Sequence, residues 1–235
     1  MKRDQLEMRA SACLFAVLTV FVTASSAHAQ DSTPAGRVVM YLVGRGLLNP
    51  NTGQGEVVGY ITEINGIPGR LFSGPPSEST AFFTFRSDIF TLQPLPTNGD
   101  VGLSLVSPGT FSIYFHTNPD GDWSNADSFS SGQLVATFKR GESLFLQIGP
   151  ASSHVLSESL ESSSDFEFAG KKFNLDCLAN RVTFSEFISN TPVPGVEGFP
   201  VGLPYAANAM AVERQRWAGE LAGNERQPRT NQVAE

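Results

Sequence analysis

The chain has 235 residues, of which 40% are hydrophobic and 17% charged, and it contains 18 Phe, 22 Gly and 15 Pro. That composition excludes a largely disordered chain and is sufficient for one domain with a sizeable buried core. The 16 basic and 23 acidic residues give a net charge of -7, and such a balance disfavours binding to the phosphate backbone of nucleic acids.

The N-terminus is typical of a cleavable secretory signal peptide covering residues 1–29. A basic start is followed by an apolar stretch at Ala10–Ala24, which is shorter than the about 20 apolar residues that span a bilayer. Ala27 and Ala29 then provide the small side chains that a signal peptidase accepts. We therefore expect export to the bacterial periplasm or the extracellular space, with no stable membrane insertion after cleavage.

Cleavage after Ala29 changes the charge and the cysteine content of the working protein. Residues 1–29 carry three basic and two acidic residues, so 16 and 23 become 13 and 21, and the net charge becomes -8. Of the two cysteines in the chain, only Cys177 is left, and it has no partner for an internal disulfide. The sequence places Cys177 on an apolar stripe, which favours a small buried hydrophobic residue over a reactive thiol.

From Arg37 onward the hydrophobic pattern has the period of two that is typical of β-strands. Two hairpins are predicted, one within 134–148 with Leu144, Leu146 and Ile148 facing the core, and one within 166–177. The segments expected to be strands are Arg37–Val43, Val57–Glu63, Ala81–Arg86, Val101–Val106, Thr110–His116, Leu134–Arg140 and Ser143–Ile148.

The spacing of these segments predicts an all-β domain at residues 30–190, built as an antiparallel barrel or sandwich. Asn180–Asn190 fits either a strand or a short helix. The serine-rich segment Ala151–Ser164 is expected to be an exposed edge strand or a loop. The pattern does not choose between a barrel and a sandwich.

Beyond residue 190 the sequence changes character. Prolines and glycines at 191–205 predict a linker, because proline cannot donate to a helix or a sheet ladder. The alanine-rich segment Ala206–Leu221 predicts a short C-terminal helix, and residues 206–235 as a whole are expected to form that helix and a loose tail.

The richest polar loop lies at Asn118–Asp127. Asp120, Asp122 and Asp127 offer oxygen ligands of the kind that calcium prefers, although the spacing fails the EF-hand pattern at Trp123 and Phe129. The favoured interpretation is a turn-rich loop whose polar side chains bond their own backbone. Trp123, a large aromatic residue in this polar segment, is a candidate contact for a ligand or partner, or else a plug for one end of the barrel.

Catalytic motifs are scarce. The chain has no G-x-S-x-G and no H-E-x-x-H, and after cleavage its only histidines are His116 and His154. A spatial grouping of Ser, His and a carboxylate stays open, since it depends on the fold. Tyr114 and His116, which follow the same strand face, are the candidate residues for binding or catalysis inside a barrel.

The sequence therefore predicts an exported, soluble, non-catalytic β-domain protein that binds a small apolar ligand or a protein partner and needs no cofactor. The alternative is a metal-free secreted enzyme, an isomerase, a cyclase or a carbohydrate-active enzyme, that uses groups inside the barrel.

Overall fold

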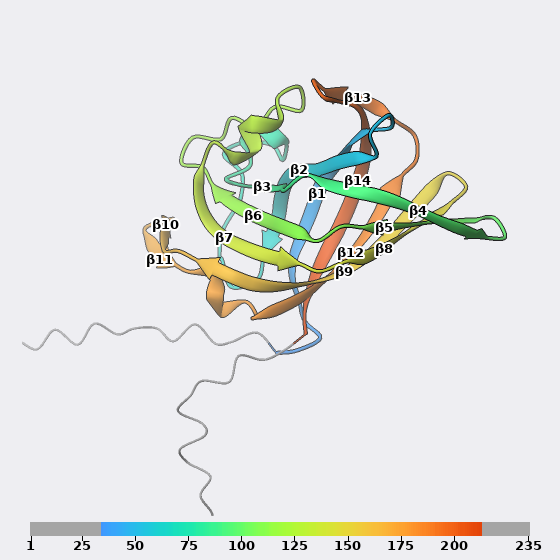
Figure 1. The fold of residues 1–235 in the computed structure, drawn as a ribbon. Helices are drawn as coiled ribbons and strands as arrows, with labels where there is room; N and C mark the ends of the chain where they lie inside the picture. Colours follow the sequence, from blue (N-terminus) through green and yellow to red (C-terminus); the bar gives the residue numbers. More distant parts are fainter. Residues whose placement is uncertain (1–33, 213–235) are drawn as a thin grey trace, which may run out of the picture.

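A computed structural model describes residues 34–212, so the predicted signal peptide and most of the predicted C-terminal helix and tail lie outside the described residues. The described part consists of strands and three short 3-10 turns (Figure 1). The strands are β1 Val38–Asn49, β2 Gln54–Ile64, β3 Phe83–Ser87, β4 Phe90–Asn98, β5 Val101–Val106, β6 Gly109–Phe115, β7 Gln133–Arg140, β8 Ser143–Ile148, β9 Ala151–Ser163, β10 Phe166–Phe168, β11 Lys171–Phe173, β12 Arg181–Ser189, β13 Val193–Val196 and β14 Phe199–Ala211.

The strands close into an antiparallel eight-stranded barrel with additional strands. Going round the wall, β1, β2, β3, β6, β7, β9, β12 and β14 each pair with the next, and β14 returns to β1 through pairs such as Tyr41 with Asn208. The prediction of an all-β antiparallel fold is confirmed, and the fold is the barrel. Within the described residues, no helix is long and apolar enough to cross a membrane.

Three of the barrel strands are long and interrupted. β3 leads into β4, β5 into β6 and β7 into β8, with two residues between the members of each pair. β2 pairs with both β3 and β4, and β9 pairs with both β7 and β8. The two strands of each of these pairs therefore lie along the same neighbouring strand. Pro108 and Gly141 stand in two of these interruptions, where proline lacks a donor and glycine weakens a strand.

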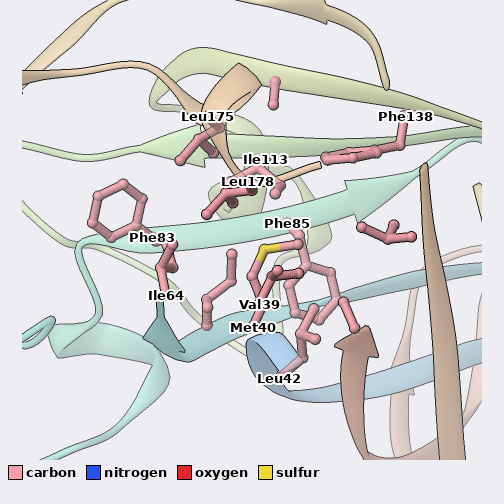
Figure 2. Packing of buried hydrophobic residues seen from close by; sticks show 14 of the residues in the cluster. Val39, Met40, Leu42, Ile64, Phe83, Phe85, Ile113, Phe138, Leu175 and Leu178 are labelled. Carbon is pink, nitrogen blue, oxygen red and sulfur yellow. The ribbon is translucent and has the colours of Figure 1, made fainter. Parts of the chain in front are cut away.

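The half of the barrel where β1 begins and β14 ends is filled with aromatic and aliphatic side chains. Segment 164–179, with β10, β11 and the 3-10 turn Leu175–Cys177, contributes to this core. Figure 2 shows Leu175 and Leu178 together with Ile113 in the same cluster. The aromatic contacts there join Phe82, Phe83, Phe115, Phe166, Phe168 and Phe173. The opposite half is less completely filled.

Several expected features differ from the structure near the C-terminus. Residues 191–205, predicted to be a linker, contain β13 and the first part of β14. Ala206–Ala211, the start of the predicted helix, continues β14 as a strand between β1 and β12. The domain therefore extends past residue 190, because the barrel needs β14 to close. Small alanine side chains at 207, 209 and 211 face the packed interior, and tertiary packing overrides their helix propensity.

Two predictions about β8 and β9 also need correction. Leu144 and Ile148 point outward and are 41% and 52% exposed, whereas Phe145 faces the interior. Ala151–Ser164, expected at an edge or in a loop, forms β9, which is paired on both sides. Asn180–Asn190 is the strand β12, and Cys177 lies in a 3-10 turn, unpaired within the described part of the chain.

Tight packing of β2 against its neighbours requires glycine at position 59. A Cβ at Gly59 would overlap the carbonyl oxygen of Val43 and come within 2.5 Å of Cζ of Phe85. By contrast, a Cβ at Gly46, on the neighbouring strand β1, would meet nothing closer than an oxygen of Leu203 at 3.9 Å. The two glycines therefore make a matched pair.

We expect Gly59→Ala to lower the free energy of unfolding by about 1–3 kcal/mol, because the wall must move to admit the methyl group. Gly46→Ala should change it by less than about 1 kcal/mol. Urea denaturation of both variants measures the difference. Equal effects at the two positions would contradict the packing argument.

Candidate functional site

A cavity occupies the half of the barrel opposite the aromatic core. Its volume is about 50 Å³, which is room for a few water molecules or a small organic group. Most of its lining is apolar and comes from strands all round the wall: Gly46, Leu48, Val57, Phe90, Leu92, Val106, Phe111, Phe145, Leu156, Phe184, Ile188 and Leu203. Such a concave, mainly apolar space with a few convergent polar groups is typical of a ligand site.

Five polar side chains line the same cavity. They come from four strands and are Arg140 on β7, His154 and Glu158 on β9, Glu186 on β12 and Tyr205 on β14. Because side chains alternate along a strand, every second residue of β9 faces inward, which places His154, Leu156 and Glu158 on one face. Pairing between strands then sets Arg140 opposite Glu158 and His154 opposite Glu186.

Arg140 and Glu158 form the deepest part of the polar group and are 3% and 2% exposed. Within the described residues, Nε of Arg140 and Oε2 of Glu158 have no hydrogen-bond partner. The rest of the Arg140 guanidinium is held in place, since Nη2 donates to the carbonyl oxygen of Ser107 at 3.4 Å and Cζ lies 5.2 Å from the centre of the Phe90 ring. Two polar atoms are thus available inside an apolar cavity.

Burial controls the protonation of this group. Desolvation raises the pKa of Glu158 to about 8, with Arg140 opposing the shift and the charge of Glu186 adding to it. Glu158 is therefore mainly a neutral acid at pH 7, able to donate a hydrogen bond. Burial likewise raises the pKa of Tyr205 well above its ordinary value, so its hydroxyl stays protonated.

A hydrogen-bonded chain of three side chains runs along one side of the cavity. Oγ of Ser143 lies 2.8 Å from Nε2 of His154, and Nδ1 of His154 lies 2.9 Å from Oε2 of Glu186. A neutral imidazole that donates from Nδ1 to Glu186 accepts from the serine hydroxyl at Nε2. This is the arrangement of a nucleophile, a base and a carboxylate that orients the base.

The barrel wall is interrupted beside this chain. Gly141 and Glu142, between β7 and β8, fall outside the ladder with β9. A surface pocket lies there and is lined by Gly141, Glu142 and Ser143 together with Arg140 and Leu156. Arg140 and Leu156 also line the inner cavity, so the surface pocket and the cavity share these two lining residues.

The sequence-predicted aromatic contact, Trp123, lies outside the barrel. The loop that carries it folds over the outer face of the wall, where Trp123 packs 4.9 Å from the Phe129 ring and beneath Arg45 at 4.4 Å. Phe129 in turn joins a small cluster with Leu47 and Val58. Trp123 therefore braces the loop against β1 and β2 and plugs neither end of the barrel.

Tyr114 and His116, the two candidate contact residues on β6 and just after it, lie on the outer side of the barrel. Tyr114 alternates with the inward residues of β6, and His116 is buried beneath the loop. Nε2 of His116 lies 2.7 Å from Oγ1 of Thr84, and Nδ1 lies 3.2 Å from a carboxylate oxygen of Asp120. Desolvation lowers the pKa of His116, and Asp120 opposes the shift. The structure therefore gives His116 a position in support of the loop.

The three carboxylates of the calcium hypothesis bond to different partners. Asp120 accepts from Ser131, Asp122 accepts from the backbone and side chain of Ser124, and Asp127 pairs with Arg86 at 2.5 Å. Within residues 34–212, no group of three or more His, Cys, Asp or Glu side chains is arranged to hold a metal ion. Calcium binding stays a prediction that nothing here tests.

Sequence reasoning did not select the residues that the barrel brings together. Ser143, His154, Glu158 and Glu186 lie on three strands, and only the pairing of those strands makes them neighbours. One local signal exists: His154 and Glu158 share a strand face with Leu156, a combination that places polar groups toward a core. No family model, curated protein or solved structure matches the chain.

The raised pKa of Glu158 makes stability depend on pH. Below the ordinary carboxyl pKa of 4.5, Glu158 is protonated in both the folded and the unfolded state. In this range its contribution to the free energy of unfolding is fully present. Between that value and about 8, the unfolded chain releases the proton while the folded chain keeps it. The free energy of unfolding therefore falls as the pH rises across this range.

Glu158→Gln should remove that component, because the amide keeps the shape and does not titrate. The surrounding Arg140, His154, Glu186 and Tyr205 remain in both proteins, so the difference between them isolates Glu158. Urea unfolding at pH 5, 6, 7 and 8 measures the two slopes. Parallel slopes would show that Glu158 ionises normally in the folded protein.

Proposed function

We propose that the protein binds a small, largely apolar molecule with a carbonyl or hydroxyl oxygen inside the barrel. The observation that carries this proposal is the pair of unpartnered polar atoms, Nε of Arg140 and Oε2 of Glu158, at the end of an apolar cavity. Buried polar groups without partners are rare because each costs about 1–3 kcal/mol. A bound oxygen would supply the missing partner.

The chemistry of the two atoms selects the ligand group. Nε of Arg140 is a donor, and Glu158 in its neutral form is a donor as well. Both favour an acceptor oxygen over an amine or ammonium. Apolar walls formed by Phe111, Phe145 and Phe184 favour a hydrocarbon body, and the small cavity favours a short one.

The cellular setting is part of the proposal. The signal-like N-terminus supports action in the periplasm or outside the cell, where small apolar compounds encounter exported proteins. The net charge of -8 after cleavage supports a partner other than nucleic acid. The ligand-binding proposal needs no metal or cofactor.

A matched pair of substitutions tests the location of the site. Gly46→Val should fill the cavity from β1, where a Cβ meets open space, and should weaken binding of acetone at least about 10-fold. Ser185→Val adds the same side chain to the exposed face of β12 and should leave binding unchanged. Titration followed by amide NMR shifts measures both affinities. Equal affinity for the two variants would place the ligand elsewhere.

A matched pair of ligands tests the polar contact. In isobutene a methylene group replaces the carbonyl oxygen of acetone, so shape is kept and the acceptor is lost. We expect the alkene to bind at least about 5-fold more weakly, because it leaves Arg140 and Glu158 unpartnered. Equal binding of the two compounds, measured by the same titration, would overturn the role of the acceptor oxygen.

A further inference from the structure

We propose that Ser143, His154 and Glu186 form a nucleophilic triad that hydrolyses small apolar esters through an acyl-enzyme. The inference rests on the proposed function, because the ester carbonyl occupies the place of the bound oxygen. It adds a reaction to that binding and assigns the residues that perform it. The observation behind it is the chain of hydrogen bonds from Ser143 to Glu186 at the edge of the cavity.

Both distances lie in the range required for a working relay. The contacts of 2.8 Å at Nε2 and 2.9 Å at Nδ1 place His154 between the hydroxyl and the carboxylate. The two ring nitrogens use different partners, as a base oriented by an acid requires. Glu186 has a side chain that is 12% exposed, and His154 one that is 8% exposed, so the pair is shielded from water.

The barrel holds the three residues rigidly. His154 pairs directly with Glu186 across β9 and β12, and Ser143 begins β8, which pairs with β9 from the other side. The aromatic ring of Phe145 packs 6.0 Å from the imidazole and limits its rotation. Groups on paired strands keep their separation well, which favours a preorganised site.

The reaction balances with water as the only co-substrate. Nε2 of His154 takes the proton of the Ser143 hydroxyl as Oγ bonds to the ester carbonyl carbon. The bond from that carbon to the alkoxy oxygen then breaks, and the imidazolium returns the proton to the leaving alcohol. Water, deprotonated by His154, attacks the acyl-enzyme, which releases a carboxylic acid and restores the serine.

Arg140 is the candidate group for stabilising the negative oxygen of the intermediate. Its unpartnered Nε lies in the same cavity as His154. Arg140 is the last residue of β7 and Ser143 is the first residue of β8, on either side of the interruption between these strands. The surface pocket at Gly141 and Glu142 reaches both Arg140 and Ser143, and offers a route for ester and water. A fixed cation near developing negative charge is an effective catalytic arrangement.

The test is hydrolysis of p-nitrophenyl acetate by the purified protein, followed by release of p-nitrophenolate. We expect turnover above the buffer rate, and a loss of at least about 100-fold in kcat/KM for Ser143→Ala, His154→Gln and Glu186→Gln. Ser112→Ala is the control, since this serine lies on β6 near Thr137, away from the cavity, and its variant should keep full activity. Circular dichroism establishes that each variant is folded.

A covalent label gives a readout that needs no variant to fold. Diisopropyl fluorophosphate should phosphorylate the wild-type protein at Ser143, as located by peptide mass spectrometry, and should abolish hydrolysis. Hydrolysis that survives in Ser143→Ala, or a label on another residue, would overturn the triad.

Failure of the triad and failure of the binding proposal give different results. If acetone binds in the cavity while the protein neither hydrolyses the ester nor takes the label, the triad is wrong and the binding proposal stands. If acetone does not bind and Ser143 is still labelled, the reactive serine is correct and its substrate lies outside the cavity. Absence of both results overturns both.

Discussion

Pairing of β1 with β14 is the interaction on which the rest of the structure depends. It joins the first and last strands of the described chain and closes the sheet, so no barrel edge is left between them. Closure also separates an interior from an exterior face along every strand. Without it, the inner face that carries Arg140, Glu158 and Glu186 would be open to water, and their charges would be screened.

Burial inside the closed barrel shifts the pKa values of the polar groups, and it also makes these groups unfavourable for the stability of the fold. A neutral Glu158 avoids most of the penalty for a buried charge, while Arg140 keeps its charge near Glu158 and Glu186. Two of their atoms still have no partner within residues 34–212. The opposite half of the barrel is filled with aromatic and aliphatic residues instead. The cost of the two unpartnered atoms is the reason for proposing a ligand that uses them.

The sequence predicts the fold well where one face of a strand is clearly apolar. Phe111, Ile113 and Phe115 face the core as their alternation indicates. The pattern is ambiguous in β8, where Leu144 and Phe145 are both apolar and only the closed barrel decides which faces inward. It misleads in β14, because alanine has a high helix propensity but here fits a crowded interior. The first half of that strand looks like a linker, since its prolines are rarely found in strands.

The site was harder to predict than the fold for a physical reason. The carboxylates of the conspicuous polar loop at Asn118–Asp127 already have partners within the protein: Ser124 in the loop, Ser131 just after it and Arg86 on β3. The groups left without partners lie on separate strands, and each looks ordinary in its local sequence.

The interruption between β7 and β8 links access to chemistry. A continuous strand would carry Gly141 and Glu142 in the ladder with β9. Because Gly141 and Glu142 do not pair with β9, Arg140 and Ser143 lie on either side of an interruption in the ladder. His154 and Glu158 lie on β9, next to this interruption. The interruption thus places Ser143 in the lining of the surface pocket, while His154, its hydrogen-bond partner, stays buried. Elsewhere on the wall, a polar group would not lie beside both a surface pocket and the inner cavity. The interruption between β7 and β8 therefore defines the candidate site more than any single residue does.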